Sequence, residues 1–279
     1  MIPFAQQVER SEQELPLLLA KICHVFCFVV FILAFALVSV NLLLPGHFPR
    51  ELAIGSEGFL LCFAAATTLC ALSRHLPAQN VLLAASVIGL IGAIATYVGL
   101  KTSVPFGPFL FSLDMKPRIS GLPWFVPIVW VVAVLNSRGV ARLGLRPWRK
   151  TRNYGWWVIG LTIVLCMMLD LGWEVFIGPI NHYVLWSQTK FPLSWHGVPF
   201  SNFLGWILTL LLIMAFCTPA LINKRHTRSI PDYHPLIVWL LLNLVCLIGA
   251  AESHLWSAVA VTAACCVIAS VFAIRGARW

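Results

Sequence analysis

Residues 155 to 177 read GWWVIGLTIVLCMMLDLGWEVFI, and Asp170 and Glu174 are the only charged side chains in this stretch. About 20 predominantly apolar residues are what an α-helix needs to cross the roughly 30 Å hydrocarbon layer of a membrane. The whole chain has this character, since 60% of its 279 residues are hydrophobic and 10% are charged, against roughly 25% charged in soluble domains. The stretch therefore predicts a membrane-spanning helix, and the composition predicts several more.

Seven further apolar runs of comparable length are bounded by Pro, Gly or charged residues. We expect all eight runs to be helices, near residues 18–44, 53–73, 80–100, 122–137, 155–177, 202–222, 235–251 and 255–274. Only Glu252, Ser253 and His254 separate the last two runs, which form either a tight hairpin or one broken helix. The predicted fold is all-α, a polytopic transmembrane bundle of about eight helices, with residues 1–279 as a single integral membrane domain.

The basic residues predict how the helices are oriented. If successive connectors alternate between the two membrane faces, fourteen of the 19 Lys and Arg residues fall on one face and five on the other. Cytoplasmic loops carry such an excess, so we expect both termini in the cytoplasm and a multi-pass protein of the inner (plasma) membrane. The basic residues of a nucleic-acid-binding domain would instead gather on a solvated face. We therefore expect the lipid bilayer, and no nucleic acid, as a partner; the sequence does not indicate an oligomeric state.

Two connectors on the predicted outer face are long, aromatic and rich in Pro and Gly. They read KTSVPFGPFLFSLDMKPRISG at residues 101–121 and GPINHYVLWSQTKFPLSWHGVPFS at residues 178–201. Non-helical backbone at membrane depth is tolerated where protein or a wet cavity satisfies its polar groups. The connectors therefore either fold back over the bundle or form an aromatic belt among the lipid headgroups, which Trp and Tyr favour.

Asp170 and Glu174 lie one helical turn apart, so they share a face of their helix. An acid within the bilayer costs on the order of 2.5–3.5 kcal/mol on lenient insertion scales, and such residues usually face the interior and mark function. Two close, desolvated carboxyl groups tend to share a proton, which such a pair can deliver to a substrate. The alternative is a structural pair at the interface, hydrogen-bonded to loop backbone. Glu57, near the outer end of the second helix, allows the same two interpretations.

Nine cysteines lie within the apolar runs, without paired C-x-x-C motifs and without clustering in the outer connectors. Cys23, His24 and Cys27 could form the corner of a metal site, but buried thiols commonly act as small hydrophobic side chains, the interpretation that we prefer. His182 and His196 flank the second connector and could join the carboxylates as ligands or proton relays. No helix carries an H-x-x-x-H pair, so we expect no metal site.

Several motifs follow one another in an order that resembles a known family. They are Pro105-Phe106-Gly107, then GLPWFVP at residues 121–127 with Trp130, then Asp170 and Glu174, and finally HGVPFSNFLGW at residues 196–206. Over residues 96–206 the chain resembles the membrane-bound carotenoid biosynthesis proteins that include the carotenoid 1′,2′-hydratases of bacteria and haloarchaea. The combination is fairly specific, whereas any one of these motifs alone would be weak.

The resemblance implies a hydro-lyase that adds water across the terminal C=C bond of an acyclic carotenoid. The substrate would be a hydrophobic carotenoid or isoprenoid, and the reaction uses neither redox chemistry nor a known organic cofactor. Protonating a trisubstituted alkene needs a positioned acid, and deprotonating water needs a base. On this resemblance Asp170 and Glu174 would be the catalytic pair. The residues expected to contact the substrate are Pro105, Phe106, Gly107, Trp130, Trp173, Trp195, His196, Asn202 and Trp206.

The chain departs from the family pattern at one position that bears on activity. The pattern has a Glu about nine residues before the Pro-Phe-Gly motif, whereas residues 95–99 read ATYVG here. The protein is therefore either a divergent enzyme with another substrate or no hydratase. A non-enzymatic membrane protein with the same fold, such as a lipid or pigment carrier or an assembly partner, is the alternative function. An ion-coupled transporter ranks third, because transporters often show paired broken helices in repeated halves and this sequence has no such repetition.

Overall fold

The computed structural model describes residues 4–44, 46–187, 193–221 and 231–279. Eight helices in these described ranges are long and apolar enough to span a membrane. They are α1 (Phe4–Leu43), α2 (Arg50–Ser73), α3 (Ala78–Thr102), α4 (Val126–Gly144), α5 (Tyr154–Val175), α6 (Phe200–Cys217), α7 (His234–Glu252) and α8 (Trp256–Ala277). The predicted all-α transmembrane bundle is confirmed, and the chain is a multi-pass membrane protein.

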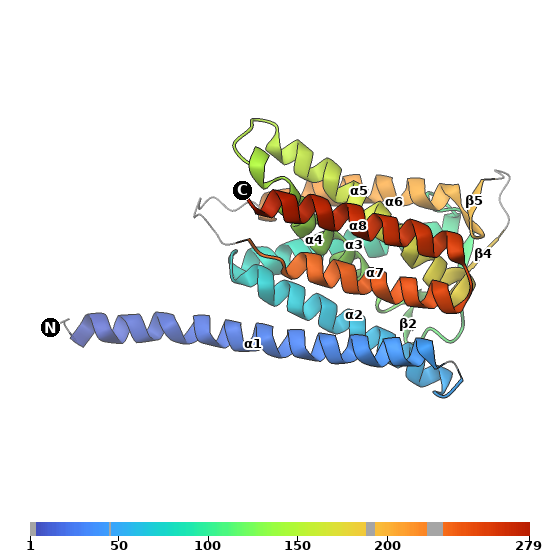
Figure 1. Cartoon of the computed structure of the whole chain (residues 1–279), viewed down its shortest axis with the longest axis horizontal. Coiled ribbons are helices and arrows are strands. Elements are labelled where there is room, and N and C mark those ends of the chain that lie inside the picture. Colours follow the sequence, from blue (N-terminus) through green and yellow to red (C-terminus); the bar gives the residue numbers. More distant parts are fainter. Residues whose placement is uncertain (1–3, 45, 188–192, 222–230) are drawn as a thin grey trace.

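The helices lie roughly side by side along the long axis of the molecule (Figure 1). α4 occupies the centre, where it packs against α2, α3, α5, α7 and α8, and 72% of its most apolar stretch is buried, more than in any other span. The beginning of α1 and the end of α8 lie at the same end of the molecule (Figure 1). An even number of spans requires this arrangement; the cytoplasmic location of that end stays a prediction.

The bounds of α1, α4 and α6 differ most from the predicted ones, and two of these differences are at helix ends, since α4 ends at Gly144 rather than near residue 137 and α6 at Cys217 rather than near residue 222. α1 begins at Phe4 rather than near residue 18, because Gln and Glu are good helix-forming residue types and the helix extends beyond its apolar span, Ala20–Leu43. α4 begins at Val126 rather than near residue 122, because residues 122 and 123 belong to a strand. The last two apolar runs form the predicted hairpin rather than a broken helix, since α7 and α8 pack against each other.

Three short antiparallel ladders, which the sequence does not predict, order the two long connectors. β1 (Phe109–Phe111) pairs with β4 (Val184–Trp186) and so joins one connector to the other. The remaining ladders are hairpins, formed by β2 (Arg118–Ile119) with β3 (Leu122–Pro123) and by β5 (Ser194–Trp195) with β6 (Val198–Pro199). The strands gather at one end of the bundle (Figure 1), which we call the connector end. Of the two predicted arrangements, the structure has the one in which the connectors fold over the bundle.

Glycines let large rings pack closely against two helices near the connector end. A Cβ atom on Gly205 of α6 would lie 2.6 Å from Cδ1 of Phe106, and a Cβ atom on Gly92 of α3 would overlap the ring of Trp130. Small residues allow such close approach between transmembrane segments. Gly205 and Gly92 therefore fix where Phe106 and Trp130 sit.

Replacing Gly205 with Ala should lower the stability of the purified protein in detergent by about 1–3 kcal/mol, the usual cost of overpacking a filled site. Gly160 of α5 is the matched control, because a Cβ atom there would meet nothing within 4 Å. Thermal unfolding midpoints of the two variants measure the difference, and Gly160→Ala should stay at or above the wild-type value. Equal midpoints for the two variants would show that Phe106 moves aside freely.

Candidate active site

A cavity of about 890 Å³ lies at the connector end of the bundle. Its wall comes from α2, α3, α4, α5, α6 and both connectors, and much of it is aromatic. The aromatic lining residues are Phe106, Phe109, Phe111, Trp124, Phe125, Trp130, Trp173, Phe176, Tyr183, Trp186 and Trp206. Ligand sites of roughly 300–1,000 Å³ with mostly apolar walls and few polar groups are typical for small molecules. This cavity therefore suits an apolar molecule or the end of a long one.

The structure brings six of the predicted site residues together in this wall. They are Phe106, Trp130, Trp173, Glu174, Asn202 and Trp206. These residues come from one connector and from three helices, α4, α5 and α6, so their convergence is a property of the fold rather than of one local segment.

The carboxyl group of Glu174 contacts the indole of Trp206, which packs in turn against the indole of Trp130. The Nε1 atom of Trp206 donates a hydrogen bond to Oε1 of Glu174 over 3.3 Å, and the amide of Asn202 approaches the same carboxyl group. The Trp206 ring packs against the Trp130 ring with centroids 3.9 Å apart and a tilt of 31° between the ring planes. Trp130 is fixed in turn, because its Nε1 atom donates to Oγ1 of Thr96 over 3.1 Å. The result is one carboxyl group oriented by the N–H edge of Trp206, whose ring is fixed in turn by Trp130.

Asp170 lies one turn deeper in α5 and borders a separate space of about 20 Å³. Trp173 and Trp206 line this small space as well as the main cavity. The Asp170 side chain is buried, and neither of its carboxyl oxygens has a hydrogen-bond partner in the described part of the chain. Such a group is expensive to bury without a partner, and unpartnered buried acids in membrane helices usually mark function.

Glu57, which the sequence left open between a functional and a structural role, also lines the cavity, as does Tyr183, which the sequence did not single out. The Tyr183 side chain approaches the carboxyl group of Glu57. Burial, and next the neighbouring Glu57 carboxyl group, raise the pKa of Tyr183 above its ordinary value. The hydroxyl group therefore keeps its proton at neutral pH and can donate it in a hydrogen bond to Glu57.

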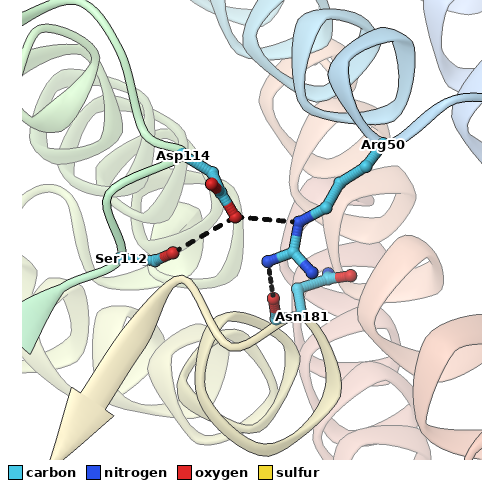
Figure 2. Close-up of polar contacts among 4 residues, drawn as sticks. All are labelled: Arg50, Ser112, Asp114 and Asn181. Carbon is cyan, nitrogen blue, oxygen red and sulfur yellow. Dashed lines mark hydrogen bonds and ion pairs between the residues drawn. The ribbon is translucent and has the colours of Figure 1, made fainter.

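Arg50 of α2 makes polar contacts with both connectors, as Figure 2 shows, and Arg50 and Asp114 also line the cavity. Nε of Arg50 lies 3.1 Å from Oδ2 of Asp114, and Nη2 of Arg50 donates to the backbone oxygen of Asn181 over 3.4 Å. Ser112 donates to the same Asp114 oxygen over 3.4 Å. Both charged side chains are about half exposed, so this ion pair lies at the edge of the cavity, whereas the acid Glu174 is buried in the largely aromatic wall.

The other predicted substrate contacts lie beside the cavity rather than in its wall. Trp195 donates from Nε1 to the backbone oxygen of Leu171 over 3.0 Å, and Nε2 of His196 lies 3.0 Å from Oγ of Ser257. These contacts fasten the β5–β6 hairpin to α5 and α8. Pro105 and Gly107 flank the lining residue Phe106, and the φ of 97° at Gly107 is a conformation that glycine adopts without strain.

The acids of the cavity are not among the described side chains whose spacing would allow them to share a metal ion. Among the described residues, one set of three His, Cys, Asp or Glu side chains has its ligand atoms close enough to share an ion, and that set lies on α1 and α2, outside the cavity. His182, which was considered as a ligand, is exposed and does not line the cavity.

Comparison with known proteins identifies the family. The model of the carotenoid biosynthesis protein family matches residues 56–269, which is more than half of the chain. The matched segment includes Glu57, Trp130, Asp170, Glu174 and Trp206. Neither the curated proteins nor the solved structures gave a match. The chain therefore belongs to the carotenoid biosynthesis protein family and has a role in carotenoid biosynthesis.

Proposed function

We propose that this protein adds water across a terminal C=C bond of an acyclic carotenoid and so forms a tertiary alcohol. The supporting observation is the position of Glu174, a buried carboxyl group in the wall of an aromatic cavity, one turn from a second buried acid. A general acid must lie within reach of the atom that it protonates. The cavity offers that position to the end of a hydrocarbon chain.

In the proposed reaction, the π electrons of the double bond take the proton of the Glu174 carboxyl group. A C–H bond forms on the less substituted carbon, and the tertiary carbon becomes a cation. The aromatic rings that line the cavity, Trp173 and Phe106 among them, stabilise this cation, as does the carboxylate that remains on Glu174. Water then forms the C–O bond and gives up a proton, so that one water molecule is added in total.

Asp170 would hold the attacking water and receive its proton. A space of about 20 Å³ beside Asp170 is large enough for one water molecule, which needs about 10–15 Å³ by this measure. The two unpartnered carboxyl oxygens of Asp170 are available as acceptors for that water. Because Glu174 is one helical turn away, the proton can pass from Asp170 back to Glu174 and restore the starting state.

Glu57 and Tyr183 would form a second polar site in the cavity, which binds the entering water or the hydroxyl group of the product. Replacing Glu57 with Ala should lower conversion roughly 2- to 10-fold, because one hydrogen bond contributes about 0.5–1.5 kcal/mol. Glu252→Ala is the matched control, since Glu252 is an exposed acid at the end of α7, outside the cavity lining. Wild-type conversion by Glu57→Ala would rule out this role.

The proposed function is tested by expressing the protein in a host that accumulates an acyclic carotene. Mass spectrometry of the pigments should show a product heavier by one water molecule, absent from cells without the protein. The alternative, a pigment carrier, is supported by the same apolar cavity. A carrier would co-purify with the pigment and leave its mass unchanged, so pigment of unaltered mass in abundant purified protein would refute the hydratase.

A further inference from the structure

Three thiols meet where α1 packs against α2. The Sγ atom of Cys23 lies 3.7 Å from that of Cys70, and the Sγ atoms of Cys23, Cys27 and Cys70 all lie within 4.8 Å of one another. Cys23 and Cys27 are four residues apart, so they share a face of α1. Cys70 follows Glu57 by thirteen residues, which separates the thiols from that acid by about 20 Å along α2.

The spacing of these sulfur atoms matches the geometry of a metal–thiolate site. Zn–S bonds of about 2.3 Å in a tetrahedral site place two sulfur ligands about 3.8 Å apart. The Cys23–Cys70 distance already has this value, and the limit of 4.8 Å leaves Cys27 within reach by a small side-chain rotation. The sequence showed only the Cys23 and Cys27 corner, because nothing in it reveals that Cys70 comes from a neighbouring helix.

We propose that Cys23, Cys27 and Cys70 form a binding site for a soft metal ion, such as Zn²⁺ or Cd²⁺, held by three thiolates. Thiolates select soft ions, whereas Mg²⁺ and Ca²⁺ prefer oxygen ligands. Binding releases the three thiol protons to solvent. Cys23 is exposed and lies within one turn of Ala20, where the apolar span of α1 begins, so an ion from the aqueous phase can reach the thiols and keep a fourth position for water or a small ligand.

Two basic side chains offset the charge of such a site. A divalent ion with three thiolates carries one net negative charge. Lys21 precedes Cys23 by two residues, and Arg74 follows Cys70 by one helical turn; both are exposed. These cations lie at the end of the bundle away from the connectors, where the ion would approach from the aqueous phase.

The site would fasten α1 to the rest of the bundle. α1 packs mainly against α2 and α7, and it lies before the segment that matches the family, which begins at residue 56. An ion that bridges α1 and α2 in the folded state alone stabilises that state by mass action. The proposal is independent of the chemistry in the cavity.

The test is a Cd²⁺ titration of the full-length protein, purified in detergent with a non-thiol reductant and a thiol assay confirming that the cysteines are reduced. We expect a thiolate-to-cadmium absorption band that saturates at one ion per chain, is displaced by Zn²⁺, and accompanies a higher thermal unfolding midpoint. Cys70→Ala should weaken binding by roughly 100-fold or more, beyond what loss of an outer-shell contact costs, and should remove the metal-dependent rise in the midpoint. Cys62→Ala, on the same helix but outside the group, should behave as wild type.

Two results would overturn the proposal. One is a reduced wild-type protein that shows no band, which would make the thiols packing groups only. The other is Cd²⁺ binding of unchanged affinity in Cys70→Ala, which would place the ion elsewhere.

Discussion

Replacing Asp170 with Asn should reduce formation of the hydroxylated carotenoid by about 10²- to 10⁴-fold, the usual contribution of a general acid or base. Asn has nearly the same shape as Asp, but it cannot take a proton from water. Because neither carboxyl oxygen of Asp170 has a hydrogen-bond partner among the described residues, the substitution breaks no hydrogen bond to them. The hydroxylated product per unit of membrane protein, quantified by mass spectrometry, measures the effect.

The abundance of the Asp170→Asn protein should equal that of the wild type, since an amide is less costly to bury than a carboxylate. Immunoblots of the membranes and the thermal unfolding midpoint check this point. Full conversion by the variant would remove Asp170 from the mechanism, and the water would then need another base.

Replacing Glu174 with Gln should cause a loss of similar size, about 10²- to 10⁴-fold, because the proposed proton donor is removed. The Gln amide oxygen can still accept the hydrogen bond from Nε1 of Trp206, so the wall of the cavity is preserved. Pigment binding should therefore persist while conversion stops. Co-purification of unconverted carotene with the variant, compared with the wild type in the same host, measures both properties.

Trp206→Phe provides a graded comparison for Glu174→Gln. It keeps an aromatic face against Trp130 but loses the hydrogen bond to Glu174. A hydrogen bond to the carboxylate that forms in the reaction contributes about 1.5–3 kcal/mol, so we expect the rate of conversion to fall roughly 10- to 100-fold. If Trp206→Phe and Glu174→Gln lost the same activity, the indole hydrogen bond would be as important as the acid itself. An active Glu174→Gln would exclude Glu174 as the proton donor.

Much of the fold could be predicted because each membrane helix must be a long apolar run. The bounds of α5 and α7 follow from composition with shifts of one or two residues. The ladders could not be predicted, because strands of two or three residues are too short to show an alternating pattern. The predicted start of α1 was too far along the chain, because the polar residues before the apolar span favour a helix but are not apolar enough to lie in the membrane.

The candidate site could be predicted where a residue type is unusual at its depth in the membrane. Asp170 and Glu174 stand out within an apolar run, and Trp130 and Trp206 belong to motifs. Glu57 was seen but not assigned, because a sequence does not show which face of α2 is turned toward the cavity. Tyr183 carried no signal, because a tyrosine near the end of a helix is also what an aromatic belt would contain.

In the β1–β4 ladder, the residues that line the cavity alternate with residues on the outer surface. Strand side chains alternate in direction, so Phe109, Phe111, Val184 and Trp186 line the cavity, whereas Leu110 and Leu185 are exposed. Backbone hydrogen bonds maintain the pairing whichever side chains are present. Odd-numbered positions of β1 can therefore evolve with the shape of the ligand, while position 110 adapts independently to the surrounding lipid or solvent.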